Sequence, residues 1–416
     1  EDGTPGTNAE GNPLSQEACS PLINNVFGKI AVVYRGSCNF SVKAVNAQDS
    51  GAVAVIIINR DPAPIEMGGG AAGPSVNIPV VMISSTDGAL LLAAMAAGSV
   101  EMFIGNKTGL YQYDAGLTQS TTLISKASGM PSQLAQDGTE FNFDLGTRVY
   151  NYGQLDQANM LLTATIDGPG GTLYDETITL PTVLSGDSMD VEPAQVLNFP
   201  QFSSTAYPDG LYTLTYNVRL DSLDEYDADN WITASFMISD SIFALAGLDT
   251  LTGLPTQNNG FRPSTNTATF SNCIVLDNPN ASRLAVEGLY FSALGSAVDL
   301  TGEEIALYAY RWEDVFTDLN DAAIAFNTLN PVGIGYYYYP SDLQGDVVYG
   351  ALNTPIALED NQRFLFCAQT VNLDVFLGFD NTLNYLWNES YYLQPLGPIE
   401  NDGAYFAAGF GMDLVS

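Results

Sequence analysis

Helical periodicity is confined to one part of this chain, and no other sequence feature limits its fold as strongly. Between about residues 28 and 104, apolar strands and helical stretches follow in the order strand, helix, strand, strand, helix. After Lys107 the sequence consists of short alternating strands with Gly, Asp and Pro turns, and useful helical periodicity is absent before about residue 239. The pattern predicts a small α/β domain followed by all-β structure.

We expect three domains in these 416 residues, because single cores of this size are unusual. Residues 1–107 are predicted to form the α/β domain, residues 108–240 a first β-sandwich, and residues 241–416 a larger, jelly-roll-like β-sandwich. Apolar residues make up 46% of the chain and are spread throughout it, so each domain has enough of them for a core.

The sequence contains no histidine, which removes the usual general base and the commonest zinc ligand. Ser-His-Asp triads, Cys-His pairs and HExxH zinc sites are therefore excluded. Carboxylate-only chemistry of the glycosidase kind stays open, because it needs just two acids and the chain has 47 Asp and Glu residues. We expect a protein that is not an enzyme.

The chain carries 12 Lys and Arg against 47 Asp and Glu, a formal net charge of -35 at pH 7. This charge repels nucleic-acid phosphates and anionic membrane surfaces, so we expect neither as a partner. The longest apolar runs, residues 52–58 and 89–97, are far shorter than the roughly 18 to 20 residues of a membrane-spanning helix. No membrane span is predicted.

Several elements near the start of the chain form an ordered series: EACSPL around Cys19, the strand and turn GKIAVVYRGSCNF, Lys43, AQDSGAVAVIIIN, NIPVVMIS and DGALLLAAMAAG. In this order they resemble the protease-associated (PA) domain over about residues 14–106. The resemblance implies a small α/β module that acts as a lid, a substrate-gating surface or a protein-binding insert, without catalytic residues of its own. It also implies a disulfide between Cys19 and Cys38.

Other residues of this region have mainly structural interpretations. Arg35 and Gly36 are expected to fix a turn beside the disulfide, with ligand binding by Arg35 as the alternative, and Lys43 is expected on the exposed face of its helix. The segment 67–73, MGGGAAG, lacks the GK[ST] of a phosphate loop. We interpret it as a flexible surface loop that is available to a partner.

The four cysteines are Cys19, Cys38, Cys273 and Cys367, and no CxxC spacing indicates a metal or redox site. Each pair falls within one predicted domain, so we expect one disulfide in each. Disulfides predict an oxidising, extracytoplasmic environment, and we expect a secreted, mature chain from which any signal peptide has been removed.

The phrases DGLYTLTYNV, DEYDADN and FMISDSIFA in the middle region resemble an immunoglobulin-like module that is common in large secreted proteins of the Bacteroidota. The resemblance implies an immunoglobulin-like β-sandwich for residues 108–240. It also implies export by the type IX pathway, with a cleaved sorting domain beyond Ser416.

The loop DSLDEYDADN, residues 221–230, concentrates negative charge. Its carboxylates are Asp221, Asp224, Glu225, Asp227 and Asp229. Ca²⁺ gathers about six to eight oxygens, which closely spaced acids in a loop can supply, so these residues are a candidate calcium site. The alternative is a solvated acidic hairpin loop, because the run lacks the central glycine and terminal glutamate of an EF-hand.

Aromatic residues are dense in the last region, where the run GIGYYYYP is predicted to be a strand with tyrosines on both faces. At least two of these tyrosines then face outward, where they can stack on sugar rings or contact a protein partner. The alternative is that the aromatic side chains fill the sandwich. The candidate partner-binding residues are Tyr336, Tyr337, Tyr338, Tyr339, Trp312 and Trp387.

These observations leave three functions open. The first is a secreted, non-catalytic surface, structural or adhesive protein that contacts other proteins and assembles, for example into a filament, through edge strands. The second is the accessory, substrate-gating region of a secreted peptidase whose catalytic domain is absent from this chain. The third is a carbohydrate-binding protein that uses the aromatic residues of the last domain.

Overall fold

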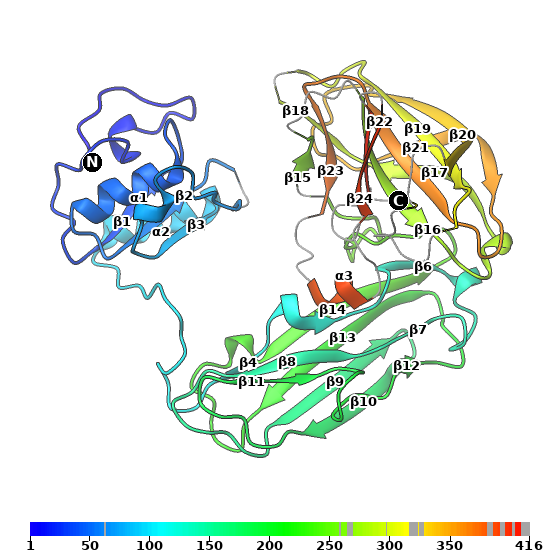
Figure 1. Cartoon of the computed structure of the whole chain (residues 1–416), viewed down its shortest axis with the longest axis horizontal. Coiled ribbons are helices and arrows are strands. Elements are labelled where there is room, and N and C mark those ends of the chain that lie inside the picture. Colours follow the sequence, from blue (N-terminus) through cyan, green and yellow to red (C-terminus); the bar gives the residue numbers. More distant parts are fainter. Residues whose placement is uncertain are drawn as a thin grey trace. The chain divides into compact units, whose positions relative to one another are not determined.

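The computed structural model describes residues 1–61, 64–257, 259–263, 269–296, 298–315, 323, 328–380, 386–391, 396–401 and 404–408. The chain is mostly β-structure with few helices, and it divides into two compact units, Glu1–Asn106 and Lys107–Ser416 (Figure 1). In the described part of the chain, no helix is long and apolar enough to cross a membrane. The predicted boundary at residue 240 falls inside the second unit, so the division of that unit into two domains stays a prediction.

The first unit is built around a parallel sheet of three short strands. These are β1 (Ile30–Tyr34), β2 (Ala54–Ile58) and β3 (Val80–Ile83), hydrogen-bonded in the order β1-β2-β3. Ile30 pairs with Ala54, and Val55 pairs with Val80. Every residue of β2 is buried, as expected for a central strand that is covered on both faces.

Two helices contact β2 from opposite sides. Helix α1 (Phe40–Asp49) joins β1 to β2, and α2 (Ser85–Ala97) follows β3. Ala47 of α1 shares a buried cluster with Val55 and Ile57, whereas α2 lies against Ile58, whose side chain points to the other face of the strand. Ser84 caps α2 by accepting a hydrogen bond from the Asp87 N–H at 2.9 Å. Two short 3₁₀ helices, η1 (Leu14–Gln16) and η2 (Gly73–Ser75), complete the unit.

The second unit begins with a sandwich whose strands are antiparallel except for β6, which pairs parallel to β14. One sheet has the order β10-β9-β13-β14-β6, and the other has the order β11-β8-β4, with β5 also paired to β8. The hydroxyl of Tyr216 in β13 accepts a hydrogen bond from the Gly146 N–H and donates one to the Leu123 carbonyl, so it links the two sheets. The strands are β4 (Ala115–Gly116), β5 (Thr122–Leu123), β6 (Gly129–Pro131), β7 (Asn142–Phe143), β8 (Gly146–Asn151), β9 (Leu161–Gly168), β10 (Gly171–Thr179), β11 (Ser188–Val191), β12 (Phe202–Ser203), β13 (Gly210–Arg219) and β14 (Trp231–Ser239).

A second group of strands follows from Asn259. Its largest sheet has the order β20-β19-β22-β16-β25-β24, and the β17-β21 pair packs on it, because Gly350 of β21 meets Leu307 of β19. A smaller sheet has the order β15-β23-β18. The elements are β15 (Asn259–Phe261), β16 (Thr269–Leu276), β17 (Ala285–Phe291), β18 (Ala293–Gly295), β19 (Glu304–Trp312), β20 (Leu329–Tyr338), β21 (Val348–Ala357), β22 (Phe364–Thr370), β23 (Val375–Phe379), α3 (Leu386–Tyr391), β24 (Leu396–Asn401) and β25 (Ala404–Ala408).

The two groups of strands in the second unit share one continuous core. Buried apolar residues from Ala115 to Leu377 form a single cluster. Polar contacts reinforce it: Arg283 donates hydrogen bonds to both carboxylate oxygens of Glu140, at 2.9 and 2.8 Å, and Asn388 of α3 accepts one from the Ile124 N–H at 2.8 Å. Short 3₁₀ helices η3 (Gln119–Thr121), η4 (Ser132–Leu134), η5 (Asp227–Asp229) and η6 (Ala281–Arg283) lie in its loops.

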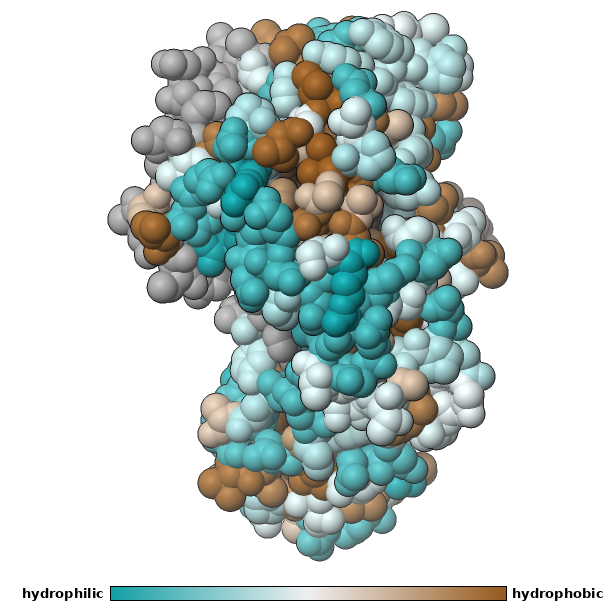
Figure 2. Space-filling view, turned by 90° about the vertical axis from the view of Figure 1, so that its right-hand side faces the viewer, coloured by the Kyte–Doolittle hydropathy of each residue, from teal (hydrophilic) through white to brown (hydrophobic). Residues whose placement is uncertain are grey.

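Figure 2 shows one face of the molecule on which teal and white residues dominate, while apolar residues gather in the upper half.

Candidate binding surfaces

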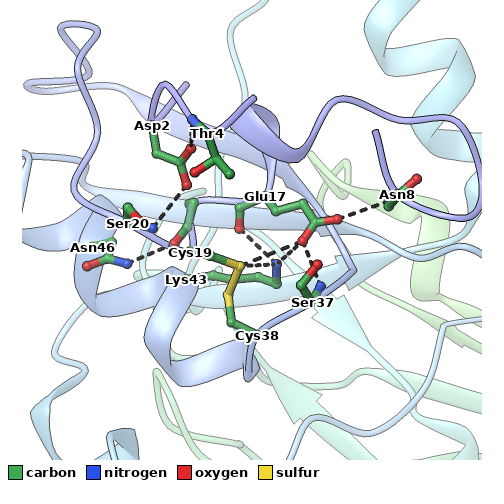
Figure 3. The surroundings of a disulfide bond; sticks show 11 residues. Asp2, Thr4, Asn8, Glu17, Cys19, Ser20, Ser37, Cys38, Lys43 and Asn46 are labelled. Carbon is green, nitrogen blue, oxygen red and sulfur yellow. Dashed lines mark hydrogen bonds and ion pairs between the residues drawn. A yellow bond between two sulfur atoms is a disulfide. The ribbon is translucent and has the colours of Figure 1, made fainter. Parts of the chain in front are cut away.

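The segment before β1 is tied to α1 by a disulfide and a buried charge pair (Figure 3). Cys19 and Cys38 form the predicted disulfide. Beside it, the Lys43 ammonium donates a hydrogen bond to the Glu17 carbonyl at 2.8 Å and lies 3.8 Å from Glu17 Oε2. The Glu17 carboxylate also accepts hydrogen bonds from the Ser37 N–H at 2.6 Å and from the Asn8 side chain at 3.1 Å. Residues far apart in sequence are thereby fixed around one buried carboxylate.

The expectation that Lys43 is exposed is wrong, because its side chain is 0% exposed. Burial lowers the pKa of Lys43 from its ordinary value, although the nearby Glu17 carboxylate acts in the opposite direction. Positions 40, 43, 44 and 47 form one helix face, so Lys43 lies on the same stripe as Phe40, Ala44 and Ala47. A buried acid on the preceding segment makes that position tolerable for a lysine.

The turn at Arg35 and Gly36 has the structural role that was expected. Arg35 donates hydrogen bonds to Asn59 Oδ1 at 2.8 Å and Asp61 Oδ2 at 3.1 Å, which joins the end of β1 to the segment after β2. A Cβ atom at Gly36 would lie 1.9 Å from Glu17 Oε1, so any other residue would displace the carboxylate. Ligand binding by Arg35 stays an untested alternative. The loop 67–73 is mostly exposed, and its contact with a partner stays a prediction.

Helix α2 leaves much of its apolar surface uncovered. Gly88 is its only buried residue, and Leu90 is 67% exposed. Between α2, the strands β1 and β2, and the following segment 98–104 lies a groove of about 820 Å³. Ile30, Val32 and Ile56 line its sheet side, Leu91 and Met95 its helix side, and Val100, Met102 and Phe103 its outer edge. Apolar side chains from the sheet, the helix and the following segment thus meet in this groove.

The acidic loop 221–230 is bonded to the chain segment that opens the second unit. Asp224 Oδ2 accepts hydrogen bonds from the Ala115 N–H and the Asn230 amide, both at 3.0 Å. Glu225 Oε2 accepts hydrogen bonds from two consecutive backbone N–H groups, those of Gln112 and Tyr113. Asp229 Oδ2 lies 2.7 Å from the Lys107 ammonium.

The described residues contain no group of three or more acids, cysteines or histidines that could hold a metal ion. Calcium binding by Asp221, Asp224, Glu225, Asp227 and Asp229 therefore stays a prediction to which the observed geometry lends no support. Sequence reasoning missed the partners of this loop, especially Lys107, because they lie more than a hundred positions earlier in the chain.

The predicted aromatic surface is only partly available. Tyr336 and Tyr338 are 47% and 58% exposed, as expected for alternate residues on the outer face of β20. Trp312 and Tyr339 are each 1% exposed, so these two cannot contact a partner while the chain is folded. Tyr339 belongs to the buried core cluster of the second unit, and the Trp312 indole N–H donates a hydrogen bond to Thr328 Oγ1 at 2.7 Å. Tyr337 is also turned inward, where its ring packs edge-on against Phe291 at 5.4 Å.

Trp387 of α3 is half-buried, and the Arg148 guanidinium lies 5.3 Å from its ring centre. It therefore serves an internal cation–π contact. The exposed tyrosines have one polar partner: the Tyr338 hydroxyl donates a hydrogen bond to Glu304 Oε2 at 2.5 Å. Partner binding by Tyr336 and Tyr338 stays a prediction.

The second predicted disulfide joins Cys273 and Cys367, and both residues are completely buried. They are directly opposite each other in the antiparallel pairing of β16 with β22, with a Cα–Cα distance of 4.1 Å. The bond therefore joins residues that are distant in sequence but adjacent in one sheet.

The first unit thus combines a short parallel sheet, a helix against each side of its central strand and a disulfide-tied N-terminal segment. Residues 4–91 match the model of the PA domain, which confirms the resemblance seen in the sequence. The chain is 35% identical over 89 residues to signal peptide peptidase-like 2 of Arabidopsis thaliana, a match that covers 20% of this chain and 16% of that protein.

Two bacterial proteins also match part of the chain. The minor extracellular protease Vpr of Bacillus subtilis is 38% identical over 74 residues, which cover 18% of this chain and 9% of Vpr. The aminopeptidase YwaD of the same species is 44% identical over 64 residues, which cover 15% of this chain and 14% of that enzyme. The chain thus spans less than a fifth of the length of each of these three relatives.

Two solved structures have distant likeness to the chain. A CARDB domain from Pyrococcus furiosus has a TM-score of 0.20 and 11% identity, covering 30% of this chain and 91% of that one. A carbohydrate-binding module of the β-sandwich superfamily has a TM-score of 0.17 and 10% identity, covering 64% of this chain and 96% of that one.

Proposed function

We propose that this chain is a secreted, non-catalytic protein that contacts further copies of itself through the groove of its PA domain. The observation that carries this proposal is the uncovered apolar surface of α2 beside that groove. Phe103, which lines the groove, is 61% exposed, and Leu90 on the uncovered surface of α2 is 67% exposed. Apolar area of this kind gains about 25 cal/mol for each Å² that a partner removes from water.

The absence of histidine supports a non-catalytic role, because it removes the usual catalytic bases. Two disulfides support an oxidising, extracytoplasmic location. On this proposal the protein is a surface or structural subunit, for instance of a filament, and export by the type IX pathway is the corresponding route.

Self-association through an apolar groove has a characteristic dependence on salt. Two chains that each carry a net charge of -35 repel each other, and salt screens this repulsion without weakening apolar contacts. Association should therefore strengthen as ionic strength rises. Contact through ion pairs would weaken instead.

The test is sedimentation velocity of the whole chain over a range of protein and salt concentrations. The wild type is expected to form dimers or larger species that increase with salt, and the Leu90→Ser/Phe103→Ser variant is expected to stay monomeric. The matched control is Val196→Ser/Leu251→Ser, which removes two apolar side chains that are 100% and 95% exposed in the second unit. A wild type that is monomeric throughout, or a control that behaves like the groove variant, would reject the proposal.

The similarity to the extracellular protease Vpr and the aminopeptidase YwaD favours a second candidate, the accessory region of a secreted peptidase. In that case the groove would cover or gate a catalytic domain, and the isolated chain would remain monomeric at all salt concentrations. Binding of the chain to such a catalytic domain, with loss of binding in the Leu90→Ser/Phe103→Ser variant, would support this candidate.

The exposed pair Tyr336 and Tyr338, with the Glu304 carboxylate beside it, favours glycan binding as a third candidate. Flat phenol rings suit stacking on sugars, and the carboxylate can accept hydrogen bonds from sugar hydroxyls. Affinity electrophoresis in neutral polysaccharides, with Tyr336→Ala/Tyr338→Ala as the variant, would decide it. Unretarded migration of the wild type would remove this candidate.

A further inference from the structure

The side chain of Lys107, the first residue of the second unit, ends among two acids and two aromatic rings. Its Nζ atom lies 2.7 Å from Asp114 Oδ1 and 2.7 Å from Asp229 Oδ2. The same atom lies 4.1 Å from the ring centre of Tyr152 and 4.7 Å from that of Tyr226. Carboxylates supply charge-assisted hydrogen bonds, and aromatic faces supply cation–π attraction. We call these four side chains the ammonium cage.

Contacts that do not involve Lys107 hold the walls of the ammonium cage. The ring of Tyr150 stacks on that of Tyr152 at 5.3 Å, and the ring of Tyr111 stacks on that of Tyr226 at 6.0 Å. The bond from the Ala115 N–H to Asp224 fixes the backbone next to Asp114. The cage is therefore organised by its own surroundings and does not depend on Lys107 to assemble it.

The floor of the cage also has its own constraints. A Cβ atom at Gly116 would lie 2.5 Å from Asp229 Oδ2 and 2.9 Å from the Tyr152 ring, so only glycine leaves room for both walls. This close approach fixes the carboxylate and the ring relative to each other.

The cage offers more acceptors than one ammonium group uses. Asp114 is 0% exposed, and its Oδ2 atom, like Oδ1 of Asp229, is buried without a hydrogen-bond partner among the described residues. Buried acceptors of this kind are costly when unpaired, and carboxylates are the costliest. Without an ammonium group, the two oxygens that Lys107 contacts, Asp114 Oδ1 and Asp229 Oδ2, would lose their cation as well, so an empty cage is unfavourable.

We propose that the ammonium cage is a binding site for primary alkylammonium groups and that Lys107 is its tethered ligand. The ligand class is a lysine side chain or a free amine of similar length. Lys107 directly follows Asn106, so its side chain in the cage fixes the backbone at the start of the second unit. A free amine that binds in the cage would displace the Lys107 side chain and release this part of the backbone.

The test uses the full chain with Lys107→Met, which keeps the side-chain length and removes the charge. n-Butylammonium is expected to bind this variant and to raise the melting temperature of the second unit, followed by tryptophan fluorescence. n-Butanol, its neutral analogue, is expected to have no such effect at equal concentration. The wild type should need at least about tenfold more butylammonium, because a tethered ligand competes at an effective concentration in the millimolar range.

Matched variants separate the cage from general amine effects. Adding Tyr152→Ala to Lys107→Met should weaken butylammonium binding by about threefold to thirtyfold, the range of one cation–π contact. Adding Asp229→Asn should weaken it at least as much, because a charge-assisted bond is lost. Adding Tyr349→Ala, at a tyrosine that is 43% exposed elsewhere in the unit, should leave it unchanged.

Equal responses to butylammonium and butanol, or no difference between the Tyr152 and Tyr349 variants, would overturn the proposal. If Lys107→Met does not fold, the wild type still decides the question. Butylammonium, but not butanol, should then increase the rate at which an acetylating reagent labels Lys107 relative to the exposed Lys29 in the same sample, as read by mass spectrometry of the digested chain. A labelling rate that does not respond to butylammonium would contradict the proposed exchange.

Discussion

At the scale of single residues, the Glu17–Lys43 pair is the contact that unites the start of the chain with the first helix. Both side chains are almost completely withdrawn from water, at 1% and 0% exposed. Each of these buried charges is stabilised by the other. Removing one partner leaves the remaining charge buried, out of reach of water and without compensation.

Lys43→Met is therefore expected to lower the free energy of unfolding of the first unit by about 3–5 kcal/mol, since it leaves the Glu17 carboxylate buried without its cation. Far-UV circular dichroism during denaturation with urea measures this loss through α1 and α2. Tryptophan fluorescence is the internal control, because all three tryptophans lie in the second unit, and it should not change.

The double variant Glu17→Gln/Lys43→Met is expected to recover part of the lost stability, because it removes both charges. The pairing would be contradicted if the Lys43→Met variant were as stable as the wild type. It would also be contradicted if the double variant lost more free energy of unfolding than the two single variants lose together.

The two disulfides are expected to differ in their reaction with reductants. Cys19 and Cys38 are half-buried, whereas Cys273 and Cys367 are 0% exposed. Because exchange requires a thiolate to reach a sulfur atom, mild reduction of the folded chain should break the first bond well before the second. Alkylation followed by mass spectrometry measures the order, and simultaneous labelling of all four cysteines would disprove it.

At the scale of elements, the packing of α2 depends on one glycine. A Cβ atom at Gly88 would lie 2.3 Å from Cγ2 of Ile58, a buried, β-branched residue of the central strand that cannot move aside. Close approach of helix and strand therefore occurs at this point, and the groove opens where the helix has larger side chains.

Gly88→Ala is expected to destabilise the first unit by about 1–3 kcal/mol through overpacking, even though alanine favours helices by about 1 kcal/mol. Thermal unfolding followed by circular dichroism measures the difference. The control is Ala89→Ser at the exposed neighbouring position, which should stay within about 0.5 kcal/mol of the wild type. A stabilised Gly88→Ala variant would show that the helix does not contact Ile58 closely.

Much of this architecture could be predicted from local patterns. The alternation of strands and helices and the placement of tyrosines on both faces of β20 follow from periods that a single segment carries, but these periods do not say which pair of tyrosines faces outward. The prediction that Lys43 is exposed was based on its charge, although its position on the helix is that of an apolar residue. The acid that stabilises it, Glu17, belongs to another segment, so local periodicity does not reveal the pair.

The remaining features depend on pairing between distant strands. The ammonium cage unites residues from 114 to 229, and the buried Trp312 donates a hydrogen bond from its indole N–H to Thr328 Oγ1, 16 positions later in the chain. Local sequence patterns do not specify such juxtapositions, since the register of one strand against another decides them. The acidic loop was noticed only because its carboxylates are neighbours in sequence.

At the scale of the whole molecule, the second unit is expected to unfold as one cooperative body, because one buried cluster joins its two groups of strands. Hydrogen exchange with mass spectrometry at increasing denaturant should give β13 and β19 the same free energy of opening, while β2 of the first unit has its own value. Opening of β19 without β13 would instead support the predicted boundary at residue 240.

The second unit should also be the first to lose stability in alkali. Burial raises the pKa of three tyrosines to about 12, namely Tyr212, Tyr310 and Tyr152. Unfolded tyrosines ionise near about pH 10, so the stability that these residues contribute is present below that pH and is lost as pH rises towards about 12. Lys43 in the first unit has the opposite sign, because its pKa is lowered by burial.

Tryptophan fluorescence during thermal unfolding at a series of alkaline pH values measures this loss. Circular dichroism gives the melting temperature of the first unit for comparison. Between about pH 10 and 12, the melting temperature of the second unit should decrease more than that of the first unit. Equal decreases in both units would contradict the assignment to buried tyrosines.

The bond between Cys273 and Cys367 also determines how the chain would respond to a pulling force. The two cysteines are 94 positions apart, and at about 3.3–3.6 Å per residue the enclosed segment could otherwise extend by on the order of 300 Å. Because the covalent link bypasses this segment, tension applied at the two ends of the chain never reaches it. Under load, β17 to β21 would remain folded while strands outside the link are stretched.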